Sequence, residues 1–107
     1  MSSIHKPINE QVMLITGASS GIGLRTAEVA AEQGAKVILL ARNEEALARA
    51  VANIRQAGGQ ATYEVVDVAD AEAFRQAAEA GAAKFGPIDT WVNNAGVGMY
   101  TRITDTD

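Results

Sequence analysis

The chain of 107 residues contains no cysteine. Disulfides and thiolate metal sites are therefore excluded, and the cytoplasm is the default location. Long hydrophobic runs are also missing: no segment approaches the roughly 20 apolar residues of a membrane-spanning helix. Residues 1–7 lack the apolar stretch of a signal peptide. We therefore expect no association with a membrane.

Positive charge is scarce as well. Nine Lys and Arg residues stand against thirteen Asp and Glu residues, which gives a formal net charge of −4 at pH 7. A nucleic-acid partner needs a clustered basic surface, so none is expected. Apolar residues, in contrast, make up 48% of the chain. This share excludes a disordered chain and, with the length, predicts one small globular domain.

Four strand-like apolar segments alternate with three segments of helical periodicity. The expected strands are Val12–Thr16, Lys36–Leu40, Thr62–Val66 and Thr90–Asn93. The first, second and fourth are continuously apolar, which is typical of a parallel sheet covered on both faces. The alternation predicts an α/β fold with a Rossmann-type doubly wound parallel sheet, of which the chain supplies a β-α-β-α-β-α-β portion with strand order 3-2-1-4.

The helices are expected to begin at Gly21, after an N-cap at Asn43, and after an N-cap at Asp70. The first is expected to end near Gln33. The residues expected on the buried faces of the three helices are Ile22, Val29 and Ala30; Leu47, Val51 and Ile54; and Phe74, Ala77, Ala78 and Phe85.

A glycine-rich segment, Thr16-Gly17-Ala18-Ser19-Ser20-Gly21-Ile22-Gly23, directly follows the first strand. Glycines at such a turn allow backbone to approach a pyrophosphate, and the N–H groups of the following helix favour an anion. The predicted phosphate cradle consists of Gly17, Ser19, Ser20, Gly21, Ile22 and Gly23. The alternative is an ordinary turn, in which the two serines form a local side-chain turn.

A second motif, Asn93-Asn94-Ala95-Gly96, follows the fourth strand. The direction of winding reverses between strands one and four, and open α/β sheets bind ligands at the carboxyl ends of their strands at such a point. We expect Asn93 to hold neighbouring strands together, and Asn94, Ala95 and Gly96 to line a cofactor. Trp91 is expected in the core.

Together, T-G-x-x-x-G-I-G and N-N-A-G resemble the motifs of the short-chain dehydrogenase/reductase family, and the resemblance covers nearly all of the chain from Gln11 onward. It implies a polar arm over residues 1–10 and an NAD(P)-binding Rossmann domain over residues 11–107. It also implies hydride transfer between a nicotinamide cofactor and a small carbonyl or alcohol substrate. The complete protein is expected to be a homo-oligomer.

The end of the second strand bears on the choice between NAD and NADP. A carboxylate about 20 residues beyond the glycines would bind the ribose 2′-OH of NAD, but Ala41 is followed here by Arg42 and Asn43. Arg42 can bind the 2′-phosphate of NADP through a charge-assisted fork, and the resemblance implies the same. NADP is therefore expected ahead of NAD. The alternative is a solvated arginine before a helix.

The resemblance also places Asp67 and Val68, which follow the third strand, beside the adenine of the cofactor. Asp67 has a structural alternative, because an aspartate in this position can cap a turn.

The family's Tyr-x-x-x-Lys pair does not occur in the chain: Tyr63 is followed four positions later by Asp67, and Tyr100 by Thr104. No catalytic residue is therefore assigned. We expect a cofactor-binding part that stops before the catalytic half and is inactive alone. The second hypothesis is a non-catalytic nucleotide-binding or sensing module.

Overall fold

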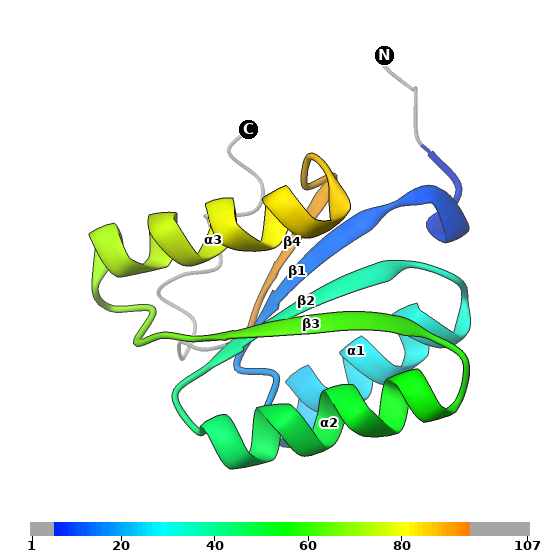
Figure 1. Cartoon of the computed structure of the whole chain (residues 1–107), viewed down its shortest axis with the longest axis horizontal. Coiled ribbons are helices and arrows are strands. Elements are labelled where there is room, and N and C mark those ends of the chain that lie inside the picture. The colour runs from blue at the N-terminus through cyan, green and yellow to red at the C-terminus, as the bar shows by residue number, and fades with distance from the viewer. Residues whose placement is uncertain (1–5, 95–107) are drawn as a thin grey trace.

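The computed structural model describes residues 6–94, in which helices cover both faces of a parallel sheet (Figure 1). A short 3-10 turn, η1 (Ile8–Glu10), precedes the alternating elements. These are β1 (Val12–Thr16), α1 (Gly21–Glu32), β2 (Lys36–Ala41), α2 (Glu44–Gln56), β3 (Gln60–Val65), α3 (Ala71–Phe85) and β4 (Thr90–Asn93). The four strands pair in parallel in the order β3-β2-β1-β4. The predicted fold class and strand order are confirmed.

The third strand begins two residues earlier than predicted and ends one residue earlier. Gln60 pairs with Lys36 at the start of β2, directly after the glycines that end α2. Val66 donates its N–H to the carbonyl of Ala41 at 2.9 Å but lies past the last pair of the ladder. Strand pairing with β2, rather than the side-chain types of β3, therefore sets the ends of this strand.

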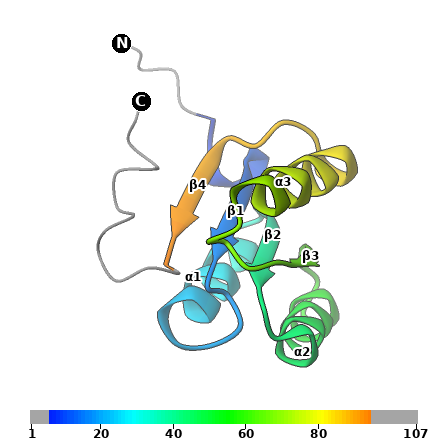
Figure 2. The ribbon, with the colours of Figure 1, turned by 90° about the vertical axis from the view of Figure 1, so that its left-hand side faces the viewer.

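Helices α1 and α2 lie on one face of the sheet and α3 on the other (Figure 2). Val37 and Leu39 of β2 belong to the core under α1 and α2, and Ile38 belongs to the core under α3. All three are fully buried. The continuously apolar sequence of β2 therefore has the predicted cause, which is burial on both faces.

The prediction for the buried face of α1 is wrong at two residues. Ile22 is 76% exposed and Val29 is 39% exposed. The face turned to the sheet consists of small residues, namely Gly23, Ala27, Ala30 and Ala31. Small side chains let the helix axis approach the sheet closely, and Ile22 and Val29 lie outside this face, whereas Leu24 is partly buried against the core.

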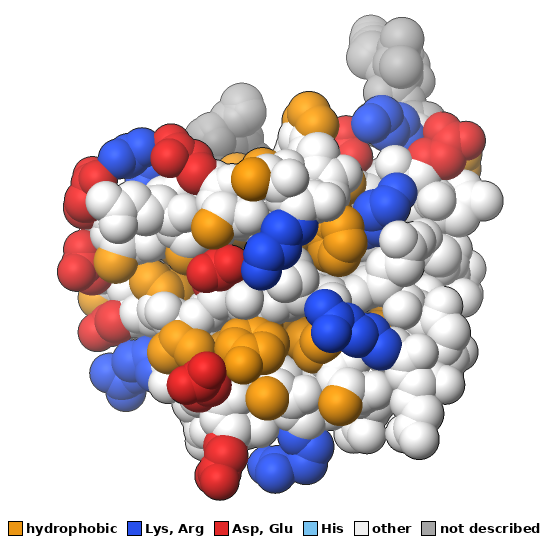
Figure 3. Space-filling view, viewed as in Figure 1, with side chains coloured by type: hydrophobic (Ala, Val, Ile, Leu, Met, Phe, Trp, Pro, Cys, Tyr) orange, Lys and Arg blue, Asp and Glu red, His pale blue; other side chains and the backbone are white. Residues whose placement is uncertain are grey.

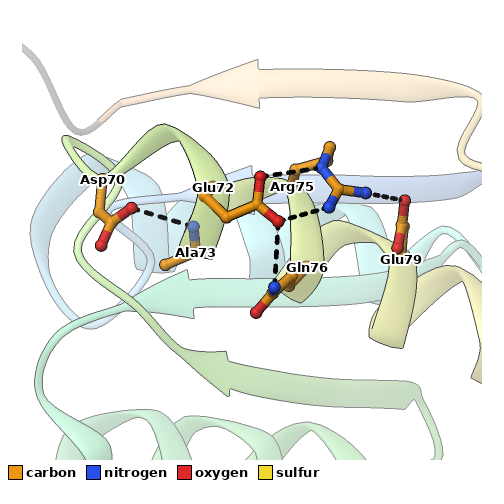
Figure 4. Close-up of polar contacts among 6 residues, drawn as sticks. All are labelled: Asp70, Glu72, Ala73, Arg75, Gln76 and Glu79. Atoms are coloured by element: carbon orange, nitrogen blue, oxygen red, sulfur yellow. Dashed lines mark hydrogen bonds and ion pairs between the residues drawn. The ribbon is translucent and has the colours of Figure 1, made fainter.

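The predicted caps of the next two helices are confirmed. Asn43 Oδ1 accepts the N–H of Ala46 at 3.0 Å, and Asp70 Oδ1 accepts the N–H of Ala73 at 3.1 Å. Figure 4 shows the second cap. The residues expected on the buried face of α2 are all buried. In α3, Ala77 is buried, as is its neighbour Ala78, whereas the two phenylalanines are partly buried.

The outer surface of α3 is polar. The guanidinium of Arg75 contacts the carboxylates of Glu72 and Glu79, one turn away on either side, and Gln76 Nε2 donates to Glu72 at 3.0 Å (Figure 4). Such exposed pairs along a helix contribute a few tenths of a kcal/mol each. No helix within residues 6–94 has the length and apolar content to cross a membrane.

The fourth strand lies at the edge of the described sheet and is only partly covered, although its continuously apolar sequence predicted cover on both faces. All four residues of β4 are half-buried, because β4 pairs within the described chain with β1 alone. Trp91 of this strand packs against Phe74 of α3, with ring centroids 5.9 Å apart. Together with Leu14, Val68 and other residues, these rings line an apolar hollow of about 60 Å³.

Candidate functional site

A wide cleft opens at the carboxyl end of the sheet, with a volume of about 890 Å³. Segments that follow all four strands contribute to its walls, as expected for an open α/β sheet. The lining residues are Gly17, Ser19, Ser20, Ile22, Gly23, Ala41, Arg42, Asn43, Val66, Asp67, Val68, Ala69, Asn93 and Asn94.

Most of the residues predicted to bind a cofactor lie in this one cleft. Gly21 is not itself a lining residue, although it lies between Ser20 and Ile22 at the first position of α1. Ala95 and Gly96 lie outside the described residues.

The turn after β1 brings backbone against backbone. Gly17 and Gly21 have φ values of +62° and +60°, in the left-handed region that favours glycine. A Cβ at Gly23 would overlap the carbonyl oxygen of Gly17 and lie 2.7 Å from its carbonyl carbon. The first turn of α1 is therefore packed tightly against the turn that precedes it.

The N-terminus of α1 differs from those of α2 and α3. Its first turn contains no acidic residue, and Ser20 makes no side-chain cap hydrogen bond within the described residues. In contrast, α2 has Glu44 and Glu45 in its first turn, and α3 has Glu72. Because the first N–H groups and the dipole of a helix favour an anion, the end of α1 at the cleft can accept one.

Arg42 and Asp67 meet at the mouth of the cleft. Arg42 Nη1 lies 3.7 Å from Asp67 Oδ2, and the two side chains are 78% and 53% exposed. The other carboxylate oxygen of Asp67 accepts the N–H of Ala69 at 2.9 Å. The turn-capping alternative for Asp67 is thus present in the structure, while its second oxygen lies beside Arg42.

A buried threonine joins the ends of β1 and β4. Thr16 Oγ1 of β1 donates to Asn93 Oδ1 at 2.8 Å, and the N–H of Asn94 donates to Thr16 Oγ1 at 2.9 Å. Thr16 is 3% exposed. Asn93 therefore holds neighbouring strands together, as expected. The amide nitrogen Nδ2 of Asn94 is buried at the cleft without a hydrogen-bond partner within residues 6–94.

Sequence reasoning missed Thr16 and the contact between Arg42 and Asp67. Both follow from strand order: β1 neighbours β4, and the residues after β2 and β3 are neighbours because Ala41 pairs with Val65. A polar residue at the end of a buried strand, directly before a glycine turn, was the signal for Thr16.

Tyr63, the described tyrosine, lies away from the cleft. Partial burial and the carboxylate of Glu44, to which its hydroxyl donates at 3.2 Å, raise the pKa of Tyr63. Within residues 6–94 no group of three or more His, Asp or Glu side chains could hold a metal ion.

The family model for short chain dehydrogenase matches residues 11–107. The chain belongs to this family. An uncharacterized oxidoreductase of Bacillus subtilis (strain 168), YxnA, is 47% identical over 100 residues, which cover 94% of this chain and 28% of that protein. The chain thus spans less than a third of the length of this curated relative.

Two solved structures share the fold. L-Sorbose reductase from Gluconobacter frateurii, complexed with NADPH and L-sorbose, is 40% identical with a TM-score of 0.77, over 82% of this chain and 34% of that one. A short chain dehydrogenase/reductase from Burkholderia phymatum, in complex with NAD, is 33% identical with a TM-score of 0.77, over 81% of this chain and 31% of that one.

Proposed function

We propose that the chain binds NADP(H) in the cleft and forms the cofactor-binding part of an oxidoreductase. The cofactor would supply or accept a hydride, and the substrate of the whole protein would be a small carbonyl or alcohol compound. The observation that carries the proposal is the acid-free N-terminus of α1 at a cleft that also contains Arg42.

The described residues fit such a cofactor. The N–H groups at the start of α1 would bind the pyrophosphate, and the packing of Gly23 on Gly17 keeps that end of the helix close to β1. The buried Nδ2 of Asn94 is a donor without a described acceptor, which a ribose oxygen would supply. The proposed binding residues are Gly17, Ser19, Ser20, Gly21, Ile22, Gly23, Arg42, Asn43, Asp67, Val68, Asn94, Ala95 and Gly96.

The preference for NADP(H) over NAD(H) rests on Arg42. The two solved relatives contain one cofactor each, NADPH in the L-sorbose reductase and NAD in the Burkholderia enzyme. In this chain no acid follows β2 within the next two positions, and the guanidinium of Arg42 is exposed at the cleft. A guanidinium favours a phosphate, whereas NAD-binding sites place a carboxylate on the ribose 2′-OH.

We further propose that proton transfer to the substrate is performed by residues beyond these 107, because the chain contains no Tyr-x-x-x-Lys pair. Oxidoreductase relatives favour this interpretation over a non-catalytic nucleotide-binding or sensing module. We also propose that the whole protein is a homo-oligomer located in the cytoplasm.

Titration of the chain with NADPH and NADH, followed by the fluorescence of the nicotinamide, tests the proposed function. We expect saturable binding of both, with NADPH the tighter ligand. Absence of binding, or tighter binding of NADH, would contradict it.

A further inference from the structure

The guanidinium that is proposed to select NADP(H) already has an anionic neighbour. Arg42 and Asp67 follow adjacent strands, at the end of a register in which Ala41 pairs with Val65. Arg42 Nη1 and Asp67 Oδ2 are 3.7 Å apart, and both residues line the cleft.

Asp67 is the fixed member of the pair. Its Oδ1 accepts the N–H of Ala69 at 2.9 Å, and its carbonyl accepts the N–H of Asp70 at 2.9 Å. These bonds hold the carboxylate in the turn before α3. Arg42 has a long, flexible side chain that is 78% exposed, so Arg42 is the partner that can move.

We propose that Asp67 competes with the 2′-phosphate of the cofactor for Arg42 and thereby lowers the preference of the cleft for NADP(H) over NAD(H). The inference rests on the proposed function. The carboxylate of Asp67 already offsets part of the charge of Arg42, and its Oδ2 lies near Nη1, one of the guanidinium donors that a phosphate would bind. The carboxylate then stays near the phosphate, and the repulsion of like charges acts in the same direction.

The size of the effect of Asp67 on the cofactor preference follows from the exposure of the Arg42 and Asp67 side chains. Exposed ion pairs contribute little, and their loss changes an equilibrium by at most about fivefold. We therefore expect Asp67 to tune the cofactor preference and not to invert it.

The variant Asp67→Asn isolates the charge, because its amide oxygen can still accept the N–H of Ala69 and keep the turn. Asp70→Asn is the matched control. It removes the same charge three residues away and keeps an oxygen for the N–H of Ala73, and Asp70 is not among the residues that line the cleft.

The probes are adenosine 2′,5′-bisphosphate and adenosine 5′-monophosphate, which differ by the 2′-phosphate alone. Calorimetric titration of the chain with each gives an affinity ratio for that group. We expect this ratio to rise about two- to fivefold in Asp67→Asn and to stay at the wild-type value in Asp70→Asn.

Repeating the comparison in an Arg42→Gln background tests whether Asp67 acts through Arg42. In that background Asp67→Asn should raise the affinity ratio much less than it does in the wild-type chain. The rise that remains would reflect only the repulsion between Asp67 and the 2′-phosphate. An unchanged ratio in Asp67→Asn, or an equal gain without Arg42, would overturn the inference. If the wild-type chain binds the bisphosphate no more tightly than the monophosphate, the proposed preference for NADP(H) fails as well.

Discussion

At the scale of single residues, Arg42 has the most specific proposed task. Replacement by Ala would remove the charged hydrogen-bond donor that we propose for the 2′-phosphate, an interaction of about 1.5–3 kcal/mol. We expect affinity for NADPH to fall about 10- to 150-fold, while affinity for NADH changes by less than about twofold.

Fluorescence titration of the wild-type chain and the variant measures both values. Arg49→Ala is a suitable control, since it removes the same charge from an exposed position of α2 that does not line the cleft. Equal losses for the two cofactors in Arg42→Ala would disprove the contact with the 2′-phosphate.

Gly23 has a different task, because it faces protein backbone. In Gly23→Ala the new Cβ would overlap the carbonyl oxygen of Gly17, which cannot move as a flexible side chain could. We expect a loss of about 1–3 kcal/mol in the free energy of unfolding, together with loss of cofactor binding. Urea unfolding and NADPH titration measure the two effects.

Gly21→Asn is the control for the loss of stability expected in Gly23→Ala. No atom lies within 4 Å of the Cβ position at Gly21, and Asn tolerates the positive φ found there. If Gly23→Ala and Gly21→Asn have the same free energy of unfolding, the tight packing of α1 on the turn does not contribute to stability.

Residues with a local task could be predicted from the sequence, and so could the role of Asn93 between strands, but its partner on the neighbouring strand could not be identified. The glycines of the first turn and the caps Asn43 and Asp70 act within a few positions of themselves. Thr16 acts on Asn93, 77 positions away, and the spacing along one strand contains no information about its neighbour.

At the scale of elements, α1 shows how an apolar pattern can mislead. Ile22 and Val29 read as the buried stripe because they are large and apolar, yet the sheet is met by Gly23, Ala27, Ala30 and Ala31. Successive residues of a helix point in directions about 100° apart, so a prediction that is shifted by one residue assigns the wrong face to the core. The close approach of helix and turn at Gly23 decides the rotation of α1.

A carboxylate ties the start of β1 to the segment before β4. Asp89 Oδ2 accepts the N–H of Val12 at 2.9 Å, and Lys6 Nζ lies 3.1 Å from Asp89 Oδ1. The hydrogen bond from Val12 and, to a smaller degree, the ammonium of Lys6 lower the pKa of Asp89 below 3.8. Its contribution to stability is therefore complete above pH 3.8 and is lost as the pH falls through the lower folded-state value.

We accordingly expect the free energy of unfolding of Asp89→Asn to depend less on pH in the acid range. Urea unfolding between about pH 5 and pH 2 should show a smaller decrease in the free energy of unfolding for the variant than for the wild type. Parallel profiles would show that Asp89 has the same pKa in the folded and unfolded chains.

The edge strand β3 is protected by basic side chains. Figure 3 shows hydrophobic side chains along the region of β3, with Lys and Arg side chains beside them. Arg55 Nε donates to the carbonyl of Ala61 at 3.0 Å, and Lys84 Nζ donates to Thr62 Oγ1 at 3.0 Å. A charged group bound to an edge carbonyl discourages pairing with a second chain.

Arg55→Ala should therefore promote self-association through β3. Sedimentation velocity over a range of protein concentrations is expected to show a larger mean sedimentation coefficient than for the wild-type chain. Arg49→Ala, which removes a charge from the same helix, is the control and should match the wild type. Identical behaviour of all three proteins would exclude a protective role for Arg55.

At the scale of the whole molecule, the described residues form a cleft that we propose to bind a cofactor, and none of them is assigned as an acid or base for catalysis. We expect the 107-residue chain to bind NADPH and yet show no NADPH oxidation with simple ketones or aldehydes, because the family's Tyr-x-x-x-Lys pair is absent from it. Absorbance at 340 nm with a panel of carbonyl compounds measures turnover. Turnover above the rate without protein would contradict the assignment of proton transfer to residues beyond these 107.

The central position of β1 has a consequence for the order in which the cleft can form during synthesis. β1 is made first, and its partner β2 follows within a few tens of residues, but Thr16 must wait for Asn93, 77 positions later. Contacts so distant in sequence form late and slowly. A nascent chain therefore exposes the glycine turn before Asn93 and Asn94, which line the same cleft, have been made.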